Sequence, residues 1–118
     1  MTGSILLDVA EVVLGSIEEV DAFKSDLIIH INSALMTLGQ IGVGEDYYRI
    51  TGDTETWSDF VGDDTRVAAI QDYVTSKVKL AFDPPSSSAA LESLTELIRE
   101  MEWRLQIQAD PVTRGDDE

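Results

Sequence analysis

The chain contains no cysteine, and this absence removes several kinds of chemistry. Its 118 residues offer no disulfide, no thiol nucleophile and no Cys-based zinc site. They include a single histidine, His30, so a centre built on paired imidazoles is excluded as well. His30 lies on the polar stripe of an amphipathic segment, where we expect it to face solvent. We therefore expect no cofactor, no metal ion and no enzymatic activity.

Short motifs that often carry chemistry are also incomplete in this chain. If Asp53 opened a calcium-binding EF-hand loop, Trp57 and Ser58 would occupy its fifth and sixth positions, where an oxygen ligand and a glycine are required. The glycines at 39, 42 and 44 match neither phosphate-binding pattern, GxxxxGK or GxGxxG. The acidic segment over residues 53–64 is therefore interpreted as a solvated loop.

Basic residues and long apolar runs are both scarce. The chain has 8 Lys and Arg against 23 Asp and Glu, a net charge of −15. Such a surface repels nucleic-acid phosphates and anionic membranes. No apolar run approaches the roughly 18 residues that span a bilayer, and we expect neither a secretion signal nor a membrane partner. The charge leaves two interpretations open: a surface that must not hold DNA, or an acidic DNA mimic or regulatory interaction protein.

What the chain does contain is helical periodicity. Apolar residues make up 43% of the sequence, and the spacing predicts helices near residues 4–14, 21–39, 63–82 and 88–108. The first helix is predicted to turn Asp8 and Glu11 to solvent, opposite an apolar side made of Ile5, Leu6, Val9, Val12, Val13 and Ile17. The predicted apolar stripe of the second helix consists of Val20, Phe23, Leu27, Ile31, Ala34, Leu38 and Ile41.

Between the predicted helices, residues 43–62 break the rhythm; Tyr47, Tyr48 and Ile50 favour a short β-hairpin-like insert, followed by a brief turn at 56–60. The predicted fold is mainly α: a small bundle of about four helices, forming one domain over residues 1–108. Residues 109–118 are predicted to be a flexible acidic tail.

A rigid stop separates the last two predicted helices. Asp83 precedes two prolines, and a residue before proline avoids the α-helical region, so the helix must end there. Ser87 or Ser88 provides a helix cap for the next segment. The sequence therefore predicts that the C-terminal half folds as an αα-hairpin.

The last helix is predicted to have apolar residues on two sides. Its core-facing stripe consists of Leu91, Leu94, Ile98, Met101 and Leu105, widened by Leu97. Trp103 and Ile107 fall on the opposite side. Aromatic residues left outside a core are typical of protein interfaces, so we favour a neighbouring copy as their partner; cover by the insert of the same chain remains the alternative. The candidates for the subunit interface are Trp103, Ile107, Arg99, Trp57 and Phe60.

Four segments, in this order, resemble the head–tail connector proteins of tailed bacteriophages, also called head-completion or adaptor proteins. They are INSA at 31–34, TWSDF at 56–60, KV at 77–78 leading to FDPP at 82–85, and EWRL at 102–105. The resemblance spans about residues 4–108.

The resemblance implies a helical protein without enzymatic activity, made in the host cytoplasm and located at the neck of the virion. Its copies would form a ring, usually twelvefold, that joins the portal protein to the stopper or tail-completion protein. The ring would extend a channel through which DNA passes without specific binding. The family often docks on the portal through its C-terminal segment, which makes Asp110, Pro111, Val112, Thr113 and Arg114 the portal-docking candidates.

Overall fold

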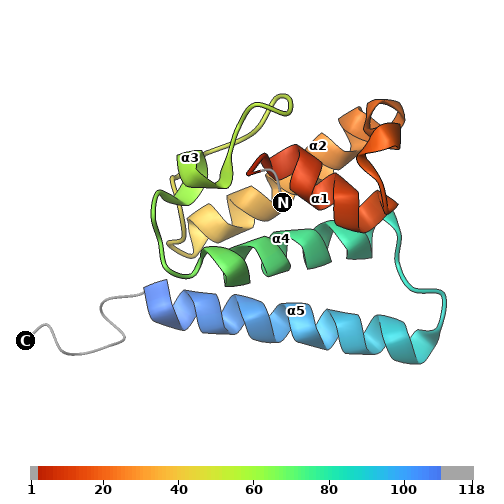
Figure 1. The fold of residues 1–118 in the computed structure, drawn as a ribbon. Coiled ribbons are helices and arrows are strands. Elements are labelled where there is room, and N and C mark those ends of the chain that lie inside the picture. The colour runs from red at the N-terminus through yellow and green to blue at the C-terminus, as the bar shows by residue number, and fades with distance from the viewer. Residues whose placement is uncertain (1–2, 110–118) are drawn as a thin grey trace, which may run out of the picture.

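The computed structural model describes residues 3–109, which form a bundle of helices (Figure 1). The elements are α1 (Ile5–Leu14), the 3-10 helix η1 (Ile17–Glu19), α2 (Val20–Gln40), α3 (Trp57–Val61), α4 (Val67–Phe82) and α5 (Ser88–Ala109). The four predicted helical segments correspond to α1, α2, α4 and α5. The prediction of a mainly α-helical bundle is therefore confirmed.

Helix α4 lies at the centre of the bundle. It contacts α1, α2, α3 and α5, and Figure 1 shows it between the α1–α2 layer and α5. Its fully buried side chains are Ile70, Tyr73, Val74 and Val78. The predicted stripe of α2 is buried at Leu27, Ile31, Ala34 and Leu38. The helical spacing of these residues explains why both helices turn one side toward a common core.

The predicted stop between α4 and α5 is present. α4 ends at Phe82, and Asp83 leaves the helical region with φ −146° and ψ 69°. The Ser87 hydroxyl then accepts a hydrogen bond from the backbone N–H of Ala90 at 3.1 Å, which satisfies a free donor at the start of α5. α4 and α5 pack against each other as the predicted αα-hairpin (Figure 1).

The prediction of a β-hairpin in the insert is wrong. Residues 43–62 are all described and contain no β-strand; Thr56 forms an isolated antiparallel bridge with Ser4. The predicted turn at 56–60 is helix α3, which begins with a capping box between Thr56 and Asp59. Tyr47 has a left-handed φ of 63°, so it interrupts the extended run that its β propensity suggested.

Side chains from α2, rather than a partner strand, fix the insert. Asn32 donates to the carbonyl of Ile50 at 3.0 Å and accepts from the N–H of Ile50 at 2.8 Å. Ile50 is thereby fully buried with both backbone groups satisfied. Within the insert itself, the backbone N–H of Glu45 donates to the carbonyl of Phe60 at 3.1 Å. These bonds hold the insert against the bundle without a sheet.

Gly44 lies directly against the ring of Phe60. A Cβ at Gly44 would be 2.5 Å from the ring, and the residue has φ +76°. Gly15 has a similar φ of +82° at the end of α1, but a Cβ there would meet nothing within 4 Å. The two glycines therefore share a backbone requirement and differ in packing.

We predict that Gly44→Ala destabilises the protein more than Gly15→Ala. Both substitutions place a side chain in the left-handed region, which costs about 1–2 kcal/mol. Gly44→Ala also forces Phe60 to move, which adds about 1–3 kcal/mol. Denaturant titration followed by circular dichroism measures both free energies of unfolding. Equal losses in the two variants would show that Phe60 yields without strain.

Candidate functional site

Helix α5 flanks the bundle and packs mainly on α4. Its core-facing side chains include Ile98, 5% exposed, and Leu105, 2% exposed. Leu94 and Met101 are half-buried beside them. Figure 1 shows α5 at the edge of the bundle, with α4 along one of its sides. α5 is thus a long helix with one side fixed and much of its surface free.

Trp103 and Ile107 lie on the open part of α5. Trp103 is 61% exposed and Ile107 is 39% exposed, while Leu105 between them is buried. The insert, which was the alternative cover, is bonded to α2 through Asn32 instead, and its Glu45 is bonded to Phe60 of its own helix α3. The described chain therefore leaves the large aromatic side chain of Trp103 mostly in contact with solvent, and aromatic residues are enriched at protein interfaces.

A polar contact across the α4–α5 interface fixes how α5 is rotated. The hydroxyl of Tyr73 on α4 donates to Oε2 of Glu102 on α5 at 2.5 Å, and Lys77 Nζ lies 3.9 Å from the same oxygen. Burial, followed by the hydrogen bond to Glu102 and its charge, raises the pKa of the Tyr73 hydroxyl far above its ordinary value. The hydroxyl therefore stays protonated and donates. Because Glu102 is held toward α4, its neighbour Trp103 is turned away from it.

The remaining interface candidates fall into two groups. Arg99 lies on α5 one turn before Trp103, with a side chain that is 66% exposed and paired with Glu96 at 2.8 Å. Trp57 and Phe60, by contrast, are only 3% and 2% exposed. Both are part of the core of their own chain. Phe60 presents almost no surface to a neighbour, whereas Trp57 also contributes to the lining of a groove.

Trp57 is held by a carboxylate that sequence reasoning placed on the wrong side of its helix. Asp8 was expected opposite the apolar side of α1, yet it is only 4% exposed. Its Oδ2 accepts hydrogen bonds from Trp57 Nε1 at 2.9 Å and from the N–H of Gly3 at 3.2 Å. The donor and acceptor are 49 residues apart, so no local pattern could reveal the pair.

A second surface, which the sequence did not reveal, lies between α1, α4 and α5. It is a groove of about 390 Å³ whose lining includes Val12, Asp72, Leu97 and Met101, with Trp57 below them. Val12 was predicted to face the core, but it is 62% exposed, and Leu97 is 48% exposed. We refer to this surface as the Val12 groove.

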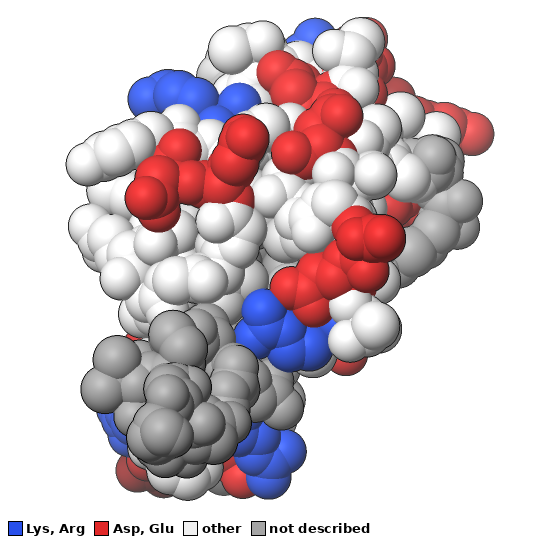
Figure 2. All heavy atoms as spheres, turned by 90° about the vertical axis from the view of Figure 1, so that its left-hand side faces the viewer, with Lys and Arg blue, Asp and Glu red and all other residues white. Residues whose placement is uncertain are grey.

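The surface around these features is acidic. Figure 2 shows Asp and Glu side chains spread over the end of the bundle at which α3 lies, with separate groups of Lys and Arg side chains between and beside them. Several of the basic side chains are engaged within their own element, such as Arg104 with Glu100 at 2.8 Å. Exposed pairs of this kind contribute about 0–1 kcal/mol each. They neutralise charge locally but do not explain assembly.

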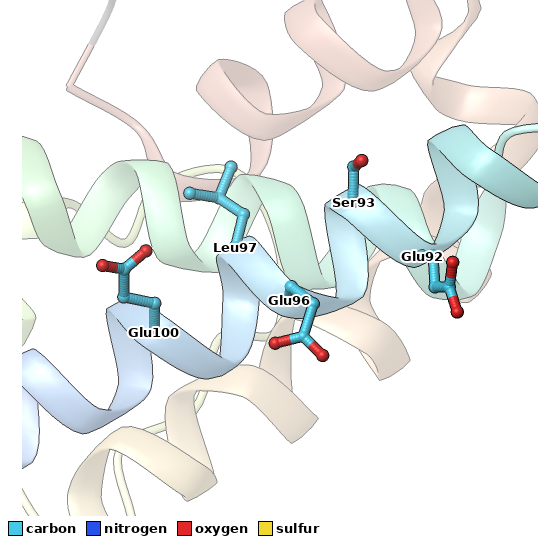
Figure 3. Close-up of a pocket in the computed structure, with 5 residues that line it drawn as sticks. All are labelled: Glu92, Ser93, Glu96, Leu97 and Glu100. Carbon is cyan, nitrogen blue, oxygen red and sulfur yellow. The ribbon is translucent and has the colours of Figure 1, made fainter.

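The outer side of α5 offers no enclosed cavity. A shallow hollow there is lined by Glu92, Ser93, Glu96, Leu97 and Glu100, all from this one helix (Figure 3). The labelled side chains point outward to different sides of the helix and do not converge on a common point. This arrangement suits contact with another protein surface better than it suits a small-molecule ligand.

The described residues also contain no arrangement of ligands for a metal. Within residues 3–109, no group of three or more His, Asp or Glu side chains could hold an ion. Contrary to expectation, His30 is half-buried, with its ring centroid 6.5 Å from that of Phe82. Over the same part of the chain, no helix is both long and apolar enough to cross a membrane.

The portal-docking candidates fall outside the described part of the chain. Asp110, Pro111, Val112, Thr113 and Arg114 all follow Ala109, the last residue that the structure describes. Their predicted role therefore remains a prediction.

Trp103 and Leu105 provide a direct test of which side of α5 belongs to the core. We predict that Trp103→Ala changes the free energy of unfolding of the monomer by no more than about 0.5 kcal/mol, because the side chain is exposed. Leu105→Ala removes a buried side chain and is expected to cost about 2–5 kcal/mol. Urea titration at a concentration that keeps the protein monomeric measures both. A large loss in Trp103→Ala would place Trp103 in the core.

Comparison with known proteins agrees with the resemblance found in the sequence. A family model described as phage connector protein matches residues 5–112. No curated protein and no solved structure matches the chain. The match covers all five α-helices, including α5 with Trp103 and Ile107. The chain therefore belongs to the phage connector protein family, a family of phage head–tail connectors.

Proposed function

We propose that this connector is the subunit of a homo-oligomeric ring that joins the portal to the stopper or tail-completion protein. The ring is twelvefold by analogy with the family, it extends the DNA channel, and it carries out no reaction. Family membership over residues 5–112 supports the connector role. The observation that carries the ring is the exposed Trp103 on a helix that packs mainly on one other helix.

The net charge of the chain fits a channel that DNA must pass through. At −15 per copy, the subunits repel phosphates and offer DNA no strong binding site. The ring would be a virion component at the neck, made in the host cytoplasm. We assign the portal-docking role to residues 110–114, which follow Ala109 in the sequence and include the basic residue Arg114.

Trp103→Ala should abolish ring formation while leaving a folded monomer. A tryptophan at the centre of an interface contributes about 2 kcal/mol or more, so its loss weakens each contact by at least about tenfold. Negative-stain electron microscopy, with and without the portal, detects the rings.

Ile29→Ala is the matched control, because Ile29 is 63% exposed on α2 and is not part of the proposed interface. This variant should form rings like those of the unsubstituted protein. Rings formed equally well by Trp103→Ala would contradict the proposed role of Trp103.

Assembly is also expected to depend on salt in a specific direction. Copies that each carry −15 repel one another, and raising the ionic strength from about 0.01 to 0.1 M shortens the Debye length from about 30 to 10 Å. Light scattering should therefore report more assembly at the higher salt concentration. Faster assembly in the low-salt buffer would contradict a contact made mainly of apolar side chains between acidic subunits.

A further inference from the structure

The two flanks of α5 present different surfaces. Figure 3 shows Leu97 leaving the helix on the side of α1, while Glu96 leaves it on another side. Arg99 is hydrogen-bonded to Glu96 at 2.8 Å, and Trp103 follows Arg99 by four residues. Residues at this spacing share a helix flank. We refer to Arg99, Trp103 and Ile107 as the Trp103 knob; it lies away from Leu97 and the Val12 groove.

The Val12 groove has the size and composition to receive a large apolar side chain. Its volume is about 390 Å³, within the range of sites that enclose drug-sized ligands. Val12 on one wall and Leu97 on the other are 62% and 48% exposed. Covering these exposed aliphatic side chains removes apolar surface from water, which favours docking.

The groove has an acidic rim, and the knob carries one basic side chain. The groove is lined by two carboxylates, Asp8 and Asp72, and by no Lys or Arg. Asp72 is exposed, whereas Asp8 is buried and bonded to Trp57. The knob carries Arg99 one helical turn from the indole of Trp103. Its guanidinium is bonded to Glu96 of the same helix at 2.8 Å, and docking would add Asp72 as a second carboxylate partner. A docked Trp103 would bring an apolar group to the floor of the groove and a guanidinium toward its acidic rim.

We propose that the Val12 groove of one copy receives Trp103 of the next copy, with Arg99 facing Asp72. This inference rests on the ring proposed above and names both surfaces of its interface. Each copy then offers one knob and one groove, which is a head-to-tail contact, and such contacts close into rings when the rotation between copies allows it. Trp103 packed against Trp103 would instead stop at a dimer.

The absence of cysteine makes this contact directly testable by cross-linking. In the double variant Asp72→Cys with Arg99→Cys, the two introduced residues provide all the thiols. Under mild oxidation in salt that favours assembly, it should form a ladder of dimers, trimers and larger species on a non-reducing gel. Either single variant links at most two copies.

Ile29→Cys with Arg99→Cys is the matched control, because Ile29 is as exposed as Trp103 but lies on α2. We expect the Asp72–Arg99 pair to link at least about tenfold faster, since docking raises the effective concentration of its thiols. If rings form but the Asp72–Arg99 pair does not cross-link faster than the control, the groove is not the receiving surface, and the connector function still stands. Monomers and no ladder at the highest concentration would overturn both.

Mixing two assembly-deficient variants provides a second test that needs no oxidation. Trp103→Ala keeps an intact groove, and Leu97→Glu keeps an intact knob while placing a charge in the groove. Each variant alone should remain monomeric. Mixed one to one, they should form a heterodimer of defined mass by light scattering, because one complementary contact survives. A mixture that stays monomeric while the unsubstituted chain assembles would overturn the proposal.

Discussion

The rotation of α5 about its own axis is the constraint on which the proposed assembly depends. A narrow strip of apolar contacts through Ile98 and Leu105 attaches this helix to α4. Apolar contact is non-directional, so by itself it would allow α5 to rotate somewhat about its own axis against α4. The hydrogen bond from Tyr73 to Glu102 is directional and removes that freedom, since Glu102 must face α4 to accept it. Trp103, the next residue, is thereby held away from α4 on a helix whose other contacts are few.

Sequence periodicity was sufficient to predict the four longer helices, because each of them buries residues at a local spacing, whereas α3 was predicted only as a turn. It also placed Trp103 and Ile107 away from the core stripe of α5. The insert could not be predicted in this way. Its conformation depends on contacts between residues far apart in the chain, such as Asn32 with Ile50 and Trp57 with Asp8. The same limit explains Val12: its spacing matches a core position, but it lines the groove between α1, α4 and α5 and is 62% exposed.

The acidity of the chain restricts where copies can meet. With 23 acidic and 8 basic residues, most pairs of surface patches on two copies repel each other. On the open side of α5, Arg99 and Arg104 each pair with a glutamate of the same helix, which lowers the net negative charge beside Trp103. Each such pair is worth about 0.3–0.5 kcal/mol to the helix itself. Its larger effect is to lower the repulsion beside Trp103, so that apolar burial determines where contact occurs.

The insert contributes to the proposed receiving groove and does not serve as a cover for Trp103. It brings Trp57 beneath the Val12 groove, where the indole is fixed by Asp8. Asn32 holds Ile50 and Phe60 packs against Gly44, so the segment that carries Trp57 is attached to the bundle at several points. A receiving surface built on such fixed residues loses little entropy on binding. Rigidity of the insert therefore favours the groove, while the open position of α5 favours the knob, and both surfaces belong to one subunit without competing for the same residues.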